Sequence, residues 1–459
     1  MNFAARGDEI RRLDASIRTP GSFVAIWGRR EVGKSRLLIE WASRNSGLYT
    51  VADQSSTPIQ RRYFASAVGT RFAGFEGGEY PNWQALFHGL DQVAARLDWR
   101  GPLIFDEFQY LVVSDPDILS EFRNWLDSPS RRMDVVVSGS SIRTMKDAIF
   151  NQRSPLYGRA TNAFQITPLR PGHLASVFPR ASHRELVSIY AVFGSTPRYL
   201  ELAEQFGGDL IDAVDTLILD PQGPLHREPD RILAMEIPTA TALRPILDGI
   251  GNGAHKVSEV ADRLGRHASG LAAPLATLTE MDMIRRETPF GSDPISGKRS
   301  LYQIADPFLR MWFRVVAPNR SLLARAPRET RVLCWEKHRL ELEAFAWGEL
   351  SRMAVPHLHR VVPELADKGP FGLAQRYWHR NEREFDIVAR SLSGAEILLG
   401  DAKWRVTDEH QDGSPIRVGS LPIGNASLIS MVFTPDALDE NVVNVIDASM
   451  VLEALRQNA

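Results

Sequence analysis

Eight consecutive residues near the start of the chain have the types and spacing of a phosphate-binding loop. The pattern G-x-x-x-x-G-K-[ST] is filled in order by Gly28, Arg29, Arg30, Glu31, Val32, Gly33, Lys34 and Ser35. In such a loop the backbone N–H groups surround the phosphates, assisted by the N-terminus of the following helix. Lys34 would reach the β- and γ-phosphates, and Ser35 would place its hydroxyl on Mg²⁺. Arg36 opens the helical segment that follows.

Two carboxylates further along the chain could complete this site. The apolar run Leu103-Ile104-Phe105 ends at Asp106 and Glu107, which after a phosphate loop indicates a Walker B segment. Asp106 would hold Mg²⁺, directly or through water, and Glu107 would orient or activate the attacking water. An Asp-Glu pair after an apolar run is usually structural when it stands alone, so this interpretation depends on the loop.

Four other polar residues could sense or complete the same site. Ser138 and Ser140 follow a third apolar run and could contact the γ-phosphate or water, or could cap a helix. Arg159, in the turn at 154–159, could serve as an arginine finger or form a surface ion pair. Arg198 lies in a turn with Gly and Pro that opens a helix. It could point back at a nucleotide from a lid, or could be an ordinary exposed arginine.

A separate set of residues near the C-terminus could act on a phosphodiester. Asp386 lies on an expected strand at 384–389, and Asp401 and Lys403 lie on the next apolar segment, 397–404. Side chains alternate across a strand, so Asp401 and Lys403 face the same way, and Asp386 could converge with them. Two carboxylates that bind Mg²⁺, beside a lysine that activates water or stabilises charge, form a phosphodiesterase arrangement.

The elements that must position the phosphate loop follow an alternating pattern. A buried strand at 23–27, the glycine loop and a helix come in the order that a phosphate loop requires. Further strands are expected at 48–52, 103–107, 134–138 and 163–166, and helices at 3–16 and through most of 173–236. This pattern predicts an α/β fold with a helical lid.

The middle of the chain has the pattern of a winged helix-turn-helix. Helices are expected at 243–250, 257–264 and 268–281, and wing strands at 283–286 and 300–304. The third helix has no Arg or Lys and contains Pro274, which would kink it or mark a late start. Basic residues lie instead on the turn and the wing: Arg263, Arg266, Arg285, Arg286, Lys298 and Arg299. This unit could touch DNA, or it could be structural and touch none.

An arginine-rich stretch follows the expected wing. It begins at the segment 306–312 and carries Arg310, Arg314, Arg320, Arg325, Arg328 and Arg331. Arginines at such scattered spacing can line a phosphate-binding face. They can equally form a solvated helix face.

Composition limits the classes of protein to consider. The 459 residues carry a net charge of −2, so any nucleic-acid site must be a local patch. The single cysteine, Cys334, excludes an intramolecular disulfide and a zinc site built from several cysteines. The longest uncharged candidate for a membrane span, 418–435, is broken by Gly, Ser, Asn and Pro. The first residues include acidic side chains and no apolar core, so no signal peptide is expected and the cytoplasm is the predicted compartment.

With these motifs in place, the chain resembles the archaeal-type ATPase family, a branch of the AAA+ and signalling-ATPase group. The resemblance extends over nearly the whole length. Its marks are GRREVGKSRLL, LIFDEFQYL, VVVSGSS, SPLYGR, GSTPRYL and DPFLRMWF. It implies ATP and Mg²⁺ bound at Gly28, Gly33, Lys34, Ser35, Asp106 and Glu107.

The resemblance also implies a C-terminal domain similar to PD-(D/E)xK nucleases. In those nucleases a glutamate on the first helix joins the metal site. The segment 344–349 does not align cleanly with the usual Phe-Glu pair, so Glu349 or Glu343 could stand in. This departure weakens the expectation of cleavage more than the expectation of the fold.

We therefore expect five parts: a P-loop ATPase core at 1–172, a helical lid at 173–236, a winged helix-turn-helix at 237–305, an arginine-rich helical connector at 306–340 and a nuclease-like domain at 341–459. The expected function is an ATP-hydrolysing switch that acts on DNA and controls the C-terminal part. The alternative is an ATP-regulated scaffold whose nuclease-like domain binds protein partners and cuts nothing. A homo-oligomer is possible in either case.

Overall fold

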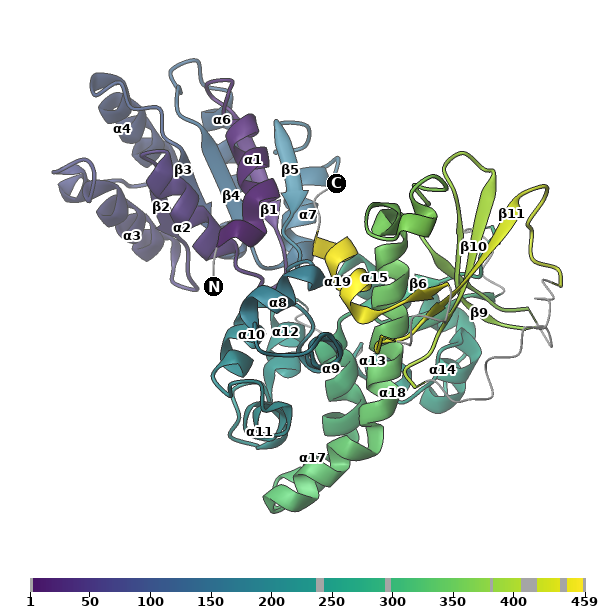
Figure 1. The fold of residues 1–459 in the computed structure, drawn as a ribbon. Coiled ribbons are helices and arrows are strands. Elements are labelled where there is room, and N and C mark those ends of the chain that lie inside the picture. Colours follow the sequence, from purple (N-terminus) through teal and green to yellow (C-terminus); the bar gives the residue numbers. More distant parts are fainter. Residues whose placement is uncertain are drawn as a thin grey trace. The chain divides into compact units, whose positions relative to one another are not determined.

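The computed structural model describes residues 3–236, 243–293, 299–379, 383–405, 419–437 and 444–456 (Figure 1). Lys298, one of the basic residues of the expected wing, lies outside these ranges. The chain divides into two units, Met1–Leu169 and Arg170–Ala459. In the described ranges no helix has both the length and the apolar composition needed to cross a membrane.

The first unit is built on a parallel sheet of five strands in the order β2-β3-β4-β1-β5. The strands are β1 Phe23–Trp27, β2 Leu48–Val51, β3 Leu103–Asp106, β4 Val135–Gly139 and β5 Asn162–Gln165. Every residue of β1, β3 and β4 is buried, as expected for a parallel sheet covered on both faces. The α/β fold class predicted from the sequence is therefore confirmed.

Helices cover both faces of this sheet because side chains alternate along each strand. Phe23 and Ala25 pack on the apolar cluster formed with α3, α4, α6 and α7, whereas Val24 and Ile26 pack on the cluster formed with α1 and α2 (Figure 1). The helices of this unit are η1 Phe3–Arg6, α1 Gly7–Ser16, α2 Lys34–Arg44, α3 Thr57–Gly69, η2 Phe75–Gly77, α4 Trp83–Arg96, α5 Gln109–Ser114, α6 Ile118–Leu126 and α7 Ile142–Phe150. Since all strands run in one direction, the carboxyl ends of β1, β3 and β4 lie at one edge, where ligands of open α/β sheets bind.

The second unit begins with the helices expected for the lid. They are η3 Pro171–His173, α8 Leu174–Val177, α9 His183–Phe193, α10 Pro197–Glu204, α11 Leu210–Val214, η4 Asp215–Leu219 and α12 Glu228–Glu236. They share this unit with the C-terminal part of the chain. Gly172, for example, lies against α19, where an added Cβ would be 2.3 Å from the backbone N of Arg456.

Residues 243–304 form helices followed by an antiparallel pair of strands. The elements are α13 Arg244–Gly251, α14 Val257–Leu264, η6 Ala268–Leu271, α15 Ala272–Glu280, β6 Ile284–Glu287 and β7 Leu301–Ile304. Pro274 is the third residue of α15, in the first turn. The late start is therefore the correct one of the two alternatives for this proline, because the first helical turn needs no N–H partner there.

The remaining chain forms a helical segment and a mixed five-stranded sheet in the order β12-β11-β10-β9-β8. Strands β8, β9 and β10 pair antiparallel, whereas β10, β11 and β12 pair parallel. The elements are α16 Pro307–Met311, η8 Trp312–Val316, α17 Ala317–Leu323, α18 Arg328–Ala354, η9 Val355–Arg360, η10 Pro363–Leu365, β8 Gln375–Tyr377, β9 Phe385–Arg390, β10 Glu396–Ala402, β11 Ser427–Phe433, β12 Val445–Ile446 and α19 Ala448–Arg456.

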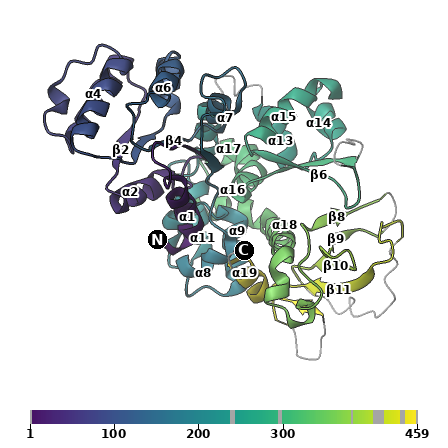
Figure 2. The same cartoon turned by 90° about the horizontal axis from the view of Figure 1, so that it is seen from above.

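The chain that follows β6 packs against this C-terminal sheet (Figure 2). The backbone N of Phe290 donates to the carbonyl of Arg376 at 2.8 Å. The Phe290 ring packs on an apolar cluster that includes Tyr377 and Phe385. The residues directly after the first expected wing strand are therefore used for a contact within the unit.

A buried carboxylate, Glu349, connects β6 with the helices α16 and α18 of the second unit. Glu349 of α18 is only 4% exposed, and it forms ion pairs with Arg285 of β6 and, at 3.1 Å, with Arg310 of α16. Burial alone would raise the pKa of Glu349, but the charges of Arg310 and Arg285 outweigh it and lower that pKa to about 2. Arg285 also contacts Glu287 at 3.0 Å, so this wing arginine is already neutralised within the unit.

Most connector arginines are neutralised in the same way. The ion pairs join Arg314 to Glu341, Arg320 to Asp230, Arg328 to Asp212 and Arg331 to Asp215. The last three connect the stretch after α16 to the lid helices. These contacts favour a structural role for the arginine-rich stretch over a phosphate-binding face.

We predict that Glu349→Gln destabilises the second unit at neutral pH by about 3–5 kcal/mol, because it leaves two arginines without their buried counter-charge. The pKa of Glu349 is lowered in the folded state from 4.5 to about 2, so the stabilisation is complete above the higher value and disappears as pH falls toward the lower one. Thermal unfolding at several pH values should therefore show a difference between wild type and variant that shrinks on acidification. The exposed Glu364→Gln is the control; an equal effect of both changes would contradict the prediction.

Candidate functional site

The phosphate loop lies between β1 and α2, at the carboxyl edge of the first sheet. Gly33 has a φ of +90° and directly precedes α2, and Glu31 has a φ of +65°. Gly28 sits so close to β5 that an added Cβ would be 2.2 Å from the carbonyl oxygen of Ile166. Only glycine fits there, which explains the first fixed position of the motif.

Two cations interact with the carbonyl groups of this loop. The ammonium of Lys34 is nearly buried and donates to the carbonyl oxygens of Gly28 at 2.8 Å and Arg29 at 3.0 Å. The guanidinium of Arg6, from the N-terminal segment, donates to the carbonyl oxygen of Val32 at 2.6 Å. By contrast, Arg30 and Arg36 are exposed. No role for Arg6 was predicted from the sequence, and its distance along the chain from the loop gives no indication of one.

Asp106 is a centre of hydrogen bonding beside the loop. Its carboxylate has no solvent exposure, and Oδ2 accepts from the hydroxyls of Ser35 and Tyr49, each at 2.6 Å. Its Oδ1 accepts from the backbone N of Glu107 at 3.0 Å. Burial, together with the Asp106 charge, raises the pKa of Tyr49, so its phenol remains a proton donor.

Glu107 follows Asp106 in a left-handed backbone conformation, with a φ of +54°. Such strain in a residue other than glycine is common at functional sites. Its Oε2 accepts from the hydroxyl of Ser140 at 2.6 Å and from the amide of Gln109. The same amide donates to the Ser140 hydroxyl at 3.0 Å. Glu107 is therefore held by two side chains, one of them Gln109, which sequence reasoning missed.

The two serines predicted at the end of β4 lie in different surroundings. Ser138 is buried, and its hydroxyl has no hydrogen-bond partner in the described part of the chain. The cap of α7 is Ser141, whose hydroxyl accepts from the backbone N of Thr144 at 3.3 Å. Of the two predicted serines, only Ser140 thus contacts a predicted catalytic residue.

Arg159 lies at the opposite edge of the sheet from the loop. It precedes the start of β5, where the backbone N of Thr161 donates to the carbonyl of Phe23, the first residue of β1. The length of β1, about 16 Å for five residues, separates this edge from the loop. The Arg159 guanidinium forms an ion pair with Asp127 at 2.6 Å. Arg198, which belongs to the second unit, is exposed at the start of α10 and lies 3.7 Å from Glu201.

Asp386 and Asp401 occupy neighbouring strands of the C-terminal sheet. The register of β9 and β10, with Gly400 opposite Ile387, continues to place Asp401 opposite Asp386. One oxygen of Asp386 accepts from the backbone N of Ala402 at 3.0 Å, and Asp401 accepts from Arg383 at 2.6 Å. Lys403 follows the end of β10, where its backbone N donates to the carbonyl of Phe433.

Neither candidate helix glutamate joins this pair. Glu349 is held by Arg285 and Arg310, and Glu343 forms an ion pair with Arg339 at 2.8 Å. Within the described ranges no group of three or more His, Cys, Asp or Glu residues is arranged to hold a metal ion. In the described part of the chain neither Glu349 nor Glu343 therefore forms a metal-binding group with Asp386 and Asp401.

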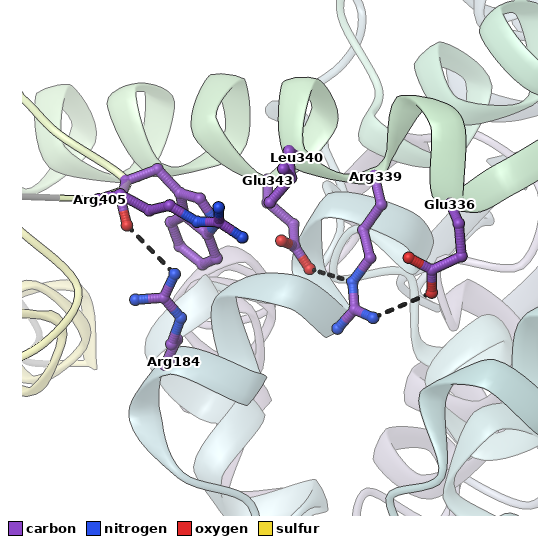
Figure 3. Close-up of a pocket in the computed structure, with 7 residues that line it drawn as sticks. Arg184, Glu336, Arg339, Leu340, Glu343 and Arg405 are labelled. Carbon is purple, nitrogen blue, oxygen red and sulfur yellow. Dashed lines mark hydrogen bonds and ion pairs between the residues drawn. The ribbon is translucent and has the colours of Figure 1, made fainter.

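Glu343 instead faces a pocket of about 360 Å³ in the second unit (Figure 3). The pocket is lined by Arg184, Glu336, Arg339, Leu340, Glu343, Trp404 and Arg405. Arg339 bridges Glu336 and Glu343, and Arg184 lies over the Trp404 ring at 4.2 Å while pairing with Asp436. Most charges of this pocket are thus balanced by neighbouring side chains.

Comparison with known proteins agrees with the geometry of the first site. Residues 3–203 match a family described as an ATPase domain predominantly from Archaea. The chain therefore carries an archaeal-type ATPase domain. Residues 312–413 match a second family, described as archaeal and bacterial proteins of unknown function. An uncharacterized protein of Methanocaldococcus jannaschii is 28% identical over 411 residues, which are 88% of each chain.

Solved structures with weaker similarity include two archaeal proteins. The ORC2 protein of Aeropyrum pernix, in ADPNP–ADP complexes, is 14% identical with a TM-score of 0.45, over 74% of this chain and 94% of that chain. Cdc6p of Pyrobaculum aerophilum is 12% identical with a TM-score of 0.36, over 74% of this chain and 95% of that chain. The predicted ATPase family is confirmed by the family match, whereas the nuclease-like character of the C-terminal domain stays a prediction.

Proposed function

We propose that the protein is an ATP-hydrolysing switch in which the state of the ATPase domain controls the C-terminal part. The observation that carries this proposal is the hydrogen bond between Ser35 of the phosphate loop and the buried carboxylate of Asp106, at 2.6 Å. It joins a phosphate-binding element to a Walker B carboxylate at the carboxyl edge of one parallel sheet.

The residues at this edge fit ATP and Mg²⁺. The backbone of the loop, from Gly28 through Arg29, Arg30, Glu31, Val32 and Gly33 to Ser35, would bind the phosphates, with Lys34 on the β- and γ-phosphates. Ser35 and Asp106 would hold Mg²⁺, which neutralises charge on the phosphate oxygens when bound. Arg36 and Arg198 are further candidates for contacts with the nucleotide.

Glu107 is proposed as the residue that orients or activates the attacking water. In this structure its Oε2 is occupied by Ser140 and Gln109. A carboxylate has two oxygens, so these bonds can hold the group in place while its other oxygen, Oε1, accepts from water. Ser140 and Gln109 therefore connect the end of β4 to the activity of Glu107.

We expect Lys34→Ala to abolish ATP hydrolysis, because it removes the main positive charge on the β- and γ-phosphates. Glu107→Gln should retain nucleotide binding and lose about 10²–10⁴-fold in turnover, since shape is kept while the base is lost. Phosphate release and the binding of a fluorescent ATP analogue measure the two effects. Lys368→Ala, an exposed lysine of the second unit, is the control. Equal turnover in wild type and Lys34→Ala would reject the proposal.

We also propose that Arg159 acts as an arginine finger on the nucleotide of a neighbouring chain. Its place at the edge opposite the loop prevents it from acting on its own nucleotide within the first unit. A homo-oligomer would be needed, and the exposed ion pair with Asp127 would have to open. Such exposed pairs are weak, typically contributing about 0–1 kcal/mol, so this cost is small.

If Arg159 acts between chains, turnover per chain should rise with protein concentration. Mixing Arg159→Ala with Lys34→Ala should then restore part of the activity, because each inactive chain supplies the group that the other lacks. Arg153→Ala, an exposed arginine nearby, should neither lower turnover nor take part in rescue. Full turnover that is independent of concentration would leave Arg159 with only its ion pair to Asp127.

The action of the C-terminal part is proposed to be on DNA, through a PD-(D/E)xK nuclease-like domain. The mixed sheet and the facing positions of Asp386 and Asp401, with Lys403 two residues further on, support this reading. The alternative is a scaffold that binds protein partners. Three observations favour this alternative. Arg383 already contacts Asp401, and the helix glutamates Glu349 and Glu343 are paired with arginines. Most connector arginines and the wing arginine Arg285 also have acidic partners.

Cleavage of linear, supercoiled and branched DNA with Mg²⁺ or Mn²⁺ separates the two alternatives. If the domain cuts DNA, Asp401→Ala should abolish cleavage and leave ATP hydrolysis unchanged, because the two sites belong to different units. The control is Asp367→Ala, an exposed aspartate. Absence of cleavage, together with no gel shift at low salt, would favour the scaffold. Cleavage that survives in Asp401→Ala would assign it to another site or to a contaminant.

A further inference from the structure

Tyr49 reaches the Walker B carboxylate from a neighbouring strand. Its position on β2 is opposite Ile104 of β3, and its hydroxyl extends along the sheet to Oδ2 of Asp106 at 2.6 Å. The same oxygen accepts from Ser35, whereas Oδ1 accepts from the backbone N of Glu107. Nothing in the motifs of the chain marks this tyrosine.

These contacts restrict both the carboxylate and the serine. A carboxylate oxygen offers two lone pairs, and on Oδ2 one is used by Tyr49 and the other by Ser35. A serine hydroxyl has one hydrogen to donate and two lone pairs. The Ser35 hydrogen is directed at Asp106, and the Tyr49 hydroxyl also interacts with Ser35, so Tyr49, Ser35 and Asp106 form one hydrogen-bonded group.

We infer that Tyr49 is a positioning residue for the metal side of the nucleotide site: it fixes the Asp106 carboxylate, and with it the Ser35 hydroxyl, the two groups that would hold Mg²⁺. Tyr49 acts mainly through Asp106, with a further contact to Ser35, and touches no reacting atom. The inference rests on the proposed ATP and Mg²⁺ site and adds a residue from β2 to it. A tyrosine that only satisfied a buried charge would support the fold without affecting the metal.

The test measures how much Mg²⁺ strengthens nucleotide binding, with a fluorescent ATP analogue titrated in Mg²⁺ and in EDTA. In Tyr49→Phe, which removes only the hydroxyl, the gain in affinity from Mg²⁺ should fall by about tenfold, as is typical when an outer-shell partner of a metal ligand is lost. Affinity in EDTA should stay the same. Tyr63→Phe, at a tyrosine that is 56% exposed, is the matched control and should behave as wild type.

A second variant shows whether the effect passes through Asp106. In an Asp106→Asn background, adding Tyr49→Phe should change the Mg²⁺ gain much less than it does in wild type, because residues that act through one contact are not additive. The same change in both backgrounds would overturn the inference. So would an unchanged Mg²⁺ gain in Tyr49→Phe alone, even with a lowered thermal stability.

Failure of the proposed function would look different. Wild-type protein that bound no nucleotide, or bound it equally in Mg²⁺ and EDTA, would reject the ATP and Mg²⁺ site itself. Thermal unfolding of every variant confirms that each is folded under the conditions of the titration.

Discussion

A carboxylate that is removed from water must receive its hydrogen bonds from the protein, and the arrangement of the first unit follows from satisfying Asp106. Burial without partners would cost several kcal/mol or force protonation. The donors come from three directions: the start of α2, strand β2 and the backbone after β3. Placing them together requires β3 beside β2 and the phosphate loop at the same edge. The strand order that supplies Asp106 with its hydrogen bonds is thus also the one that forms the candidate metal site.

The second unit has its own buried carboxylate, with a different partner set. Glu349 is balanced by arginines rather than by hydroxyl groups. The hydroxyl donors bring no positive charge to Asp106, whereas Glu349 is paired with two guanidinium groups. Both residues are acidic and almost inaccessible. Only the chemistry of the neighbours separates a candidate binding residue from a structural one, and the sequence alone does not show that Arg285 and Arg310 surround Glu349.

The sequence was informative where function depends on consecutive residues. The loop at 28–35, the pair Asp106-Glu107 and the strands around them were predicted from local spacing, and the late start of α15 was one of two alternatives for Pro274. Contacts between distant segments were not predictable. Tyr49 is an ordinary residue until the sheet brings it to Asp106, and Gln109 until the fold brings Ser140 beside it and Glu107. Likewise, the arginines at 285 and 310–331 could be counted, but apart from Glu287 the acidic partners named above lie 27 to 116 residues away along the chain.

The packing of Phe290 has a consequence for how this architecture can vary. Its ring belongs to the apolar cluster of a sheet whose strands begin some 85 positions later, and an added Cβ at the adjacent Gly291 would lie 2.3 Å from Pro422. A hairpin seated in this way is not an exchangeable module. Substitutions at Phe290 and Gly291 must be compatible with substitutions in the C-terminal sheet on which they pack. The two segments should therefore diverge together among relatives. A truncated chain that begins after the hairpin would present a bare apolar surface and tend to associate with itself.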